Sequence, residues 1–320
     1  MGPFTYHRAA SLAEAAERLA RPGALPLGGG TDLLVFLGED LAHPSELVDL
    51  TRVPGLRSVT ASGDGSVRIG AGARVNDLAA HPMLRERFAA LAEACASVGT
   101  TALRHMGTIG GNLCQRPRCW YFRRGIPCLK SSGDGCPAAD GESQYHAILG
   151  GGPCYIVHPS DPAVALTALD ATVELYSARG ARRLPVAEFY VLPSERLDHE
   201  TVLAPGEIVS AIELPATSAG GVQRYHKVMQ RGSWDFALVS LAAARRADGE
   251  VRLVLGGVAP RPWRVTSSVE EDVSSGGLGD DDVATLAERA LHDARALAKN
   301  AYKIDLAASL LRRAIRELMT

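Results

Sequence analysis

The chain has 320 residues, of which 46% are hydrophobic and 22% charged, and its net charge is −2. This length leaves room for about two or three domains with buried cores. The arginines are dispersed and balanced by acids, so we expect no nucleic-acid partner, and no run reaches the roughly 18 apolar residues that a membrane span needs.

Helix and strand patterns alternate at the start of the chain. Ser11 and Glu14 have the spacing of a capping box and predict that a helix follows. An apolar run at 24–27 leads into a glycine turn and a second apolar stretch at 33–37, and a strand pattern at 46–50 comes next. Strand, glycine turn, helix and strand together predict a βαβ unit.

The middle of the chain continues this alternation. A helix at 87–98 carries Cys95 on its apolar face, so we expect this cysteine in a core. The other expected elements are a strand at 67–70, helices at 75–84 and 161–171, and a strand at 172–176.

A different pattern, richer in strands, begins near residue 191. We expect strands at 207–214, 224–229 and 252–256, a helix at 236–246, a loop at 268–282 and two closing amphipathic helices. The last helix carries an apolar stripe of Ile304, Ala307, Ala308, Leu311, Ile315 and Leu318.

Two glycine-rich turns are candidate anion sites. Gly28-Gly-Gly30-Thr31 lies between a strand and an expected helix, where glycines let backbone amides approach a phosphate. Gly107-Thr-Ile-Gly-Gly-Asn112 adds hydroxyl and amide side chains. Both could also be tight turns with no ligand. Neither a complete dinucleotide fingerprint nor a Walker A motif is present, so the turns do not indicate a nicotinamide or nucleoside triphosphate site.

Five of the six cysteines lie between residues 114 and 154, in a polar segment rich in glycine and proline. Three interpretations compete for them: an iron–sulfur cluster, structural zinc, and structural or redox-active thiols. The wide spacings favour a cluster wrapped by a loop, because zinc knuckles usually pair cysteines two to four residues apart. A cubane takes four thiolates, and Cys114, directly behind the second glycine turn, is the one we leave out.

The two glycine motifs, in this order, resemble the FAD loops of the flavoprotein subunit in the xanthine dehydrogenase / CO dehydrogenase family. Trp234–Ser240 and Gly256–Pro262 resemble the C-terminal domain of the same subunit, so the resemblance covers nearly the whole chain. It implies an α/β FAD-binding region of two subdomains, about 1–55 and 56–180, with FAD between them. An α+β domain with an antiparallel sheet would follow at 181–320.

The cysteine-rich insert at 113–154 resembles that of a subgroup with an additional four-iron four-sulfur (4Fe-4S) cluster. Arg118–Arg123, Gln144–Ala147 and Cys154–Asp161 carry this likeness to the FAD subunit of periplasmic aldehyde oxidoreductases and, more distantly, to the 4-hydroxybenzoyl-CoA reductase β subunit. The resemblance implies that the cluster ligands are Cys119, Cys128, Cys136 and Cys154.

The resemblance also implies a set of FAD contacts. The first turn would hold the pyrophosphate, the second turn would line the other side of the dinucleotide, and Ser160 and Asp161 would contact the ribityl–adenosine portion. Ile208 and Lys227 would lie near the flavin ring; Asp161 could instead serve as a helix N-cap. The full set is Leu27, Gly28, Gly29, Gly30, Thr31, Asp32, Thr108, Gly110, Gly111, Asn112, Ser160, Asp161, Ile208 and Lys227.

A flavin performs the redox chemistry itself, so we expect no acid–base pair or nucleophile, and we interpret His105, His146 and His158 as hydrogen-bonded loop residues. By resemblance, electrons would come from a molybdenum-cofactor large subunit through a 2Fe-2S small subunit and pass through this FAD to an external acceptor. A xanthine dehydrogenase-like or CoA-thioester reductase is the alternative complex. A zinc-stabilised scaffold without flavin is the alternative of another class.

The N-terminus lacks the apolar stretch of a secretory signal. We therefore expect a cytoplasmic location, with export on a twin-arginine-signal partner as the alternative.

Overall fold

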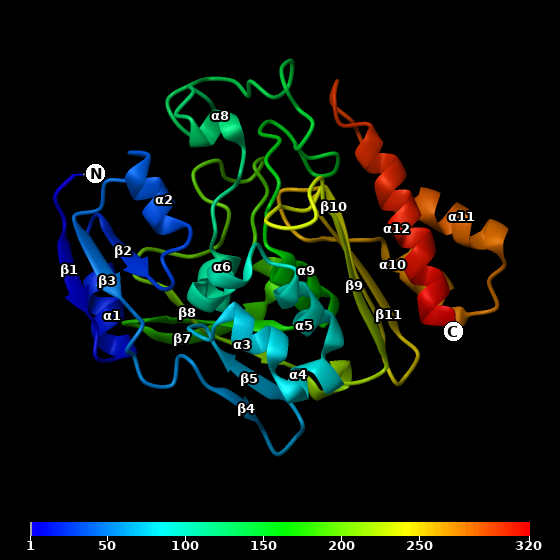
Figure 1. Cartoon of the computed structure of the whole chain (residues 1–320), viewed down its shortest axis with the longest axis horizontal. Coiled ribbons are helices and arrows are strands. Elements are labelled where there is room, and N and C mark those ends of the chain that lie inside the picture. Colours follow the sequence, from blue (N-terminus) through cyan, green and yellow to red (C-terminus); the bar gives the residue numbers. More distant parts are fainter. Residues whose placement is uncertain (1) are drawn as a thin grey trace.

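The computed structural model describes residues 2–320. Its strands form three separate sheets, and helices pack between and outside them (Figure 1). None of the helices in this range combines the length and the hydropathy needed to cross a membrane.

The first sheet is parallel, with strand order β1-β3-β2. Ser11 caps the first helix, because its hydroxyl accepts a hydrogen bond from the Glu14 amide at 3.1 Å. The predicted βαβ unit is confirmed, because β2 pairs in parallel with β3 and α2 lies between them in the chain. The elements of this region are β1 (Thr5–Arg8), α1 (Leu12–Leu19), β2 (Ala24–Leu27), α2 (Leu33–Gly38) and β3 (Glu46–Asp49).

The second sheet is antiparallel and has the order β4-β5-β8-β6-β7. Because β8 is hydrogen-bonded to β5 and β6, this sheet is continuous across residue 181, where the sequence placed a domain boundary. The strands are β4 (Val59–Ala61), β5 (Val67–Gly70), β6 (Thr172–Ser177), β7 (Gly180–Pro185) and β8 (Ile208–Leu214).

A group of short helices packs on this sheet (Figure 1). The helix predicted at 75–84 is divided at His81, whose extended backbone is the conformation favoured before a proline. Cys95 is fully buried, as predicted. These helices are α3 (Val75–Ala80), α4 (Pro82–Arg87), α5 (Ala89–Ala96), α6 (Thr101–Met106), α7 (Ile109–Leu113) and α9 (Asp161–Ala168). The helix α8 (Trp120–Arg123) lies apart from them in the cysteine-rich insert, and 3-10 turns lie at Val186–Glu188 and Ala216–Ser218.

The third sheet is also antiparallel, in the order β12-β11-β10-β9, and three helices cover its outer face (Figure 1). The predicted strands and closing helices are confirmed here. The elements are β9 (Val222–Val228), β10 (Val239–Arg245), β11 (Val251–Gly256), β12 (Trp263–Arg264), α10 (Ser267–Ser275), α11 (Asp280–Ala290) and α12 (Tyr302–Met319).

Two predictions in this region are wrong. Residues 236–246 are not a helix, because most of them form β10 between two apolar cores. Leu241 and Ala243 face the core under α10–α12, whereas Ala242 and Ala244 face the core that contains α5 and α9. Residues 268–282 are not one loop, since α10 occupies the first half and buries Val269.

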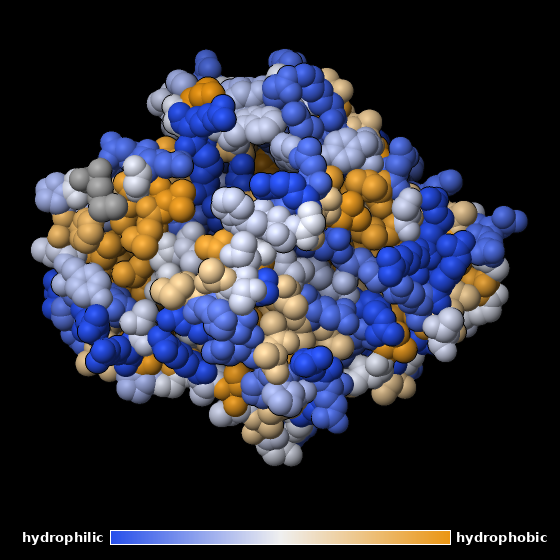
Figure 2. Space-filling view, in the orientation of Figure 1, coloured by the Kyte–Doolittle hydropathy of each residue, from blue (hydrophilic) through white to orange (hydrophobic). Residues whose placement is uncertain are grey.

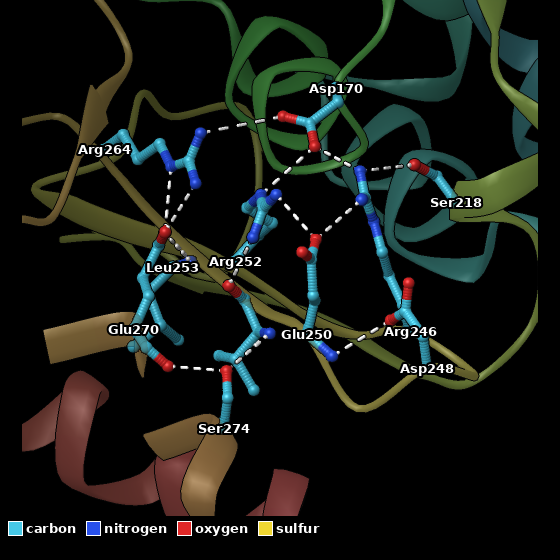
Figure 3. A network of polar contacts seen from close by, with 11 residues as sticks. Asp170, Ser218, Arg246, Asp248, Glu250, Arg252, Leu253, Arg264, Glu270 and Ser274 are labelled. Atoms are coloured by element: carbon cyan, nitrogen blue, oxygen red, sulfur yellow. Dashed lines mark hydrogen bonds and ion pairs between the residues drawn. The ribbon is translucent and has the colours of Figure 1, made fainter. Parts of the chain in front are cut away.

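An ionic network fastens the third sheet to the end of α9 (Figure 3). Asp170, which lies between α9 and β6, contacts Arg246 and accepts a hydrogen bond from Arg252 at 3.1 Å. Arg264 approaches the same carboxylate at 3.8 Å and pairs with Glu270 of α10. Together with the shared core, these contacts join the two halves of the chain.

The cysteine-rich insert rises from the body between α7 and α9, and within the described residues α8 is its one helix. Figure 1 shows α8 and its loops at the top of the molecule, and Figure 2 shows that this part has a mostly hydrophilic surface.

Candidate functional site

The first glycine turn presents unpaired backbone donors. Gly30 has a φ of +74°, a conformation that favours glycine. Within residues 2–320 we find no hydrogen-bond acceptor for the backbone amides of Gly29, Gly30, Thr31 and Asp32. Consecutive free amides in a turn form a concave site for an anion.

The second glycine turn lies directly against the first. A Cβ on Gly28 would lie 2.9 Å from Thr108 Oγ1, and one on Gly29 would collide with the Met106 carbonyl oxygen. Thr108 caps α7 by accepting a hydrogen bond from the Gly111 amide at 3.2 Å. The structure therefore brings together the two turns that the sequence singled out 80 residues apart.

A hydrogen bond links the second glycine turn to the start of α9. The Ser160 hydroxyl donates to the side-chain oxygen of Asn112 at 2.6 Å and accepts from the Ala163 amide, which makes Ser160 the N-cap of α9. Asp161 is the first helical residue instead of the cap, so its alternative interpretation as an N-cap is wrong.

Asp161 forms a buried ion pair. Its carboxylate lies 2.8 Å from Lys227 Nζ and accepts a hydrogen bond from the Tyr225 hydroxyl at 2.7 Å. Burial raises the pKa of Asp161, and the ammonium of Lys227 opposes this rise. The pair connects α9 to β9, so Ser160, Asp161 and Lys227 lie close together.

A cavity of about 460 Å³ opens next to this group. Its walls come from the N-terminus of α9, the insert and the 230–240 segment, so it lies between the FAD-loop half of the chain and the third sheet. Aromatic rings make up much of the wall: Trp120, Tyr145, His146, His158 and Phe236.

Two predicted contacts lie elsewhere. Ile208 packs in a separate core with Leu56 and Val48, and the structure does not bring it to the cavity. The Asp32 carboxylate accepts hydrogen bonds from the Arg116 amide and the Arg123 guanidinium and pairs with Arg118, each at 2.9 Å. Asp32 therefore binds the insert through its side chain, and only its backbone amide is free for a ligand.

The four predicted cluster cysteines line one small pocket within the insert, together with Lys130, Phe122 and Ile156. All are free thiols, and neither Cys95 nor Cys114 is among the lining residues. A hydrogen bond between Cys136 and Cys154 lowers the pKa of Cys136 to about 6 and raises that of Cys154.

The four thiols line the same pocket, but they are not arranged around a position for one metal ion. In the described part of the chain, no three His, Cys, Asp or Glu side chains are arranged to hold one metal ion. The free volume is about 10 Å³, so the thiols would have to turn apart around a cluster. The donor set suits iron and sulfide, and each thiolate of a cubane binds a different iron.

Sequence reasoning missed the arginines that hold the insert. Arg116, Arg118 and Arg123 cluster in eight residues with no nearby acid in the sequence, which could have indicated a distant carboxylate partner. The expectation of hydrogen-bonded loop histidines holds for His158, which accepts from the Ser160 amide at 3.4 Å, and is wrong for His105, which lies exposed on α6. Burial lowers the pKa of His158 to about 3 and that of His146 to about 4.

Comparisons with known proteins cover the whole chain. Residues 2–217 match the family model described as the FAD binding domain in molybdopterin dehydrogenase, and residues 224–318 match the CO dehydrogenase flavoprotein C-terminal domain. The solved structure of carbon monoxide dehydrogenase from Hydrogenophaga pseudoflava aligns with a TM-score of 0.76 at 25% identity, covering 99% of this chain and 97% of that one. The predicted fold class is confirmed.

Among curated relatives, the aldehyde oxidoreductase FAD-binding subunit PaoB of Escherichia coli K12 is 42% identical, with 84% of this chain and 85% of the relative covered. The glyceraldehyde dehydrogenase medium chain of Sulfolobus acidocaldarius is 30% identical, covering 89% and 86%. A xanthine dehydrogenase FAD-binding subunit of Escherichia coli O157:H7 is 28% identical, covering 90% and 85%.

Proposed function

The chain belongs to the family of FAD-binding subunits of molybdopterin dehydrogenases, and we propose that it is the electron-transferring subunit of a molybdenum-dependent aldehyde oxidoreductase, carrying FAD and a 4Fe-4S cluster. In this role it accepts electrons from a 2Fe-2S subunit and passes them to an external acceptor. The observation that carries the proposal is the contact between the two glycine turns, where four consecutive backbone amides are free.

The residues fit FAD in the following way. The amides of Gly29, Gly30, Thr31 and Asp32 hold the pyrophosphate, and the turn from Thr108 to Asn112 closes over its other side. Ser160 and Asp161 line the aromatic cavity and hold the part of the dinucleotide that reaches it, and Lys227 pairs with Asp161 behind them. FAD supplies the one- and two-electron chemistry when bound, and the protein positions it.

The cluster proposal depends on the convergence of Cys119, Cys128, Cys136 and Cys154 on one buried pocket. The alternative is a zinc-stabilised scaffold, which would use the same thiols without a flavin. Membership of the FAD-binding family favours the flavoprotein over the scaffold.

Aldehydes are the proposed substrate class of the complex. Two relatives at 30% identity or more carry names of aldehyde-oxidising enzymes, whereas the xanthine dehydrogenase subunit is at 28%. A xanthine dehydrogenase-like or hydroxybenzoyl-CoA reductase-like complex is the second candidate. The molybdenum cofactor and the 2Fe-2S clusters are assigned to partner subunits, because the family models that match this chain account for residues 2–217 and 224–318 with a flavin domain and its C-terminal domain. A cytoplasmic location, or export with a partner, stays a prediction that cell fractionation tests.

Reconstitution tests the proposal. The purified chain is mixed anaerobically with an aldehyde, alone or with its partner subunits, and the visible flavin absorption is followed. We expect bleaching only when both the molybdenum and the 2Fe-2S subunits are present. A mixture without the 2Fe-2S subunit is the matched control, and bleaching of the isolated chain by aldehyde would contradict the proposal.

A further inference from the structure

One cysteine separates the two cavities of the site. Cys119 lines both the aromatic cavity and the thiol pocket, whereas Cys128, Cys136 and Cys154 line only the thiol pocket. A side chain that forms a hydrogen bond with the Cys119 sulfur therefore lies at the boundary between the proposed flavin site and the proposed cluster site.

His146 contacts this sulfur. Its Nε2 lies 3.3 Å from Cys119 Sγ, and its side chain lines the aromatic cavity. The other ring nitrogen, Nδ1, is buried without a hydrogen-bond partner in the described chain, and only 3% of the residue is exposed. One ring nitrogen, Nε2, therefore contacts the sulfur, and the other, Nδ1, has no partner among the described residues.

The surroundings fix the position of the ring. The backbone amide of His146 donates to the Ser143 carbonyl at 3.0 Å, and its carbonyl accepts from the fully buried Asn300 at 3.1 Å. Trp120 and Tyr121, which follow Cys119 on α8, contact the ring with centroid distances of 6.2 and 6.1 Å. The imidazole therefore has little freedom to leave the sulfur.

A thiolate accepts hydrogen bonds and has no proton to donate. If Cys119 is a cluster ligand, His146 must donate from Nε2, which leaves Nδ1 as an acceptor. Hydrogen bonds to cluster sulfurs withdraw charge from them and stabilise the reduced, more negative cluster, so they raise its reduction potential.

We propose that His146 is a positioning residue that donates a hydrogen bond to the Cys119 thiolate, raises the reduction potential of the cluster and forms the wall through which the cluster faces the flavin cavity. This inference depends on the proposed function, since it needs the cluster. Ser131, whose hydroxyl lies 3.6 Å from Cys128 Sγ, contacts a pocket thiol that does not line the aromatic cavity.

Two variants separate the hydrogen bond from the ring. His146→Phe keeps a planar ring but removes the donor, and His146→Gln keeps a donor. His158→Phe is the matched control, because His158 is also buried and lines the same cavity, but in the described chain it has no hydrogen bond to a thiol. In redox titrations followed by electron paramagnetic resonance, we expect a more negative cluster potential in His146→Phe, recovery toward the wild-type value in His146→Gln and no shift in His158→Phe.

A measurement on the wild-type chain covers the case in which a variant loses its iron. In protein labelled with ¹⁵N only at histidine, pulsed paramagnetic resonance of the reduced cluster should show coupling to one histidine nitrogen. Iron bound without that coupling, or an unchanged potential in an iron-replete His146→Phe, would overturn the role of His146 alone. Absence of iron from the wild-type chain would overturn the cluster proposal as well.

Discussion

The carboxylate of Asp32 lies 2.9 Å from Nη2 of Arg123, which follows it by 91 residues. The same carboxylate pairs with Arg118, and the Arg116 amide donates to it. One side chain in the first glycine turn therefore holds the start of the cysteine-rich insert, and the proposed FAD and cluster sites share a support.

Replacing Asp32 with asparagine should loosen the insert. The change keeps the shape but leaves two largely buried guanidinium groups without their countercharge, and we expect a loss of about 2 kcal/mol in the free energy of unfolding. Urea titration measures this loss, and limited proteolysis of the insert should become faster.

Asp140→Asn is the matched control for Asp32→Asn, because Asp140 is an exposed carboxylate of the same insert. It should change neither stability nor proteolysis. Equal behaviour of the two variants would show that Asp32 does not hold the insert.

Gly29→Ala should weaken flavin binding. Its Cβ would meet the Met106 carbonyl, so the two glycine turns must move apart, and such overpacking costs roughly 1–3 kcal/mol. Flavin content per chain and the melting temperature should both fall. Gly63→Ala, where no atom lies within 4 Å of the new Cβ, should leave both unchanged.

The sequence carries the information for the features that depend on local chemistry. Glycine spacing identified the two turns, and the apolar faces of α5 and α12 placed Cys95, Leu311 and Ile315 in cores. These signals are readable because each residue type has a direct effect on the backbone or on burial.

The failures have a common cause in tertiary context. β10 is apolar on both faces because it separates two cores, so the alternation typical of a half-buried strand is missing and its alanines indicate a helix. The arginine cluster could indicate a distant carboxylate but not that Asp32 is the partner, because these residues lie 84 to 91 positions apart and no local pattern links them.

His158 should make the apo-protein sensitive to mild acid. Burial lowers its pKa from 6.5 to about 3, so the unfolded chain binds a proton that the folded chain excludes. The contribution of neutral His158 to the free energy of unfolding is present above pH 6.5 and is lost progressively as the pH falls from 6.5 toward 3. Between pH 7 and pH 5 the loss from this group is at most about 2 kcal/mol.

His158→Gln should reduce this acid sensitivity. Urea unfolding of the apo-protein at pH 7 and pH 5 measures the difference for the wild type and the variant. The same pH dependence in both proteins would mean that His158 is not held neutral by burial.

Cys128→Ser should abolish the cluster, whereas Cys114→Ser should keep it. Cys128 lines the thiol pocket, whereas Cys114 is not among its lining residues. Iron and sulfide content per chain separate the two variants. Loss of iron from Cys114→Ser with retention in Cys128→Ser would contradict the ligand set. If Cys128→Ser keeps FAD and turnover in the complex, the cluster is a structural clamp.

The most direct test of the whole account is a count of iron, sulfide and flavin in the chain purified anaerobically with its partners removed. We expect about four irons, about four sulfides and about one FAD per chain, with the visible absorption of both groups. A folded preparation that is colourless and free of iron, or that holds one zinc and no flavin, would contradict it.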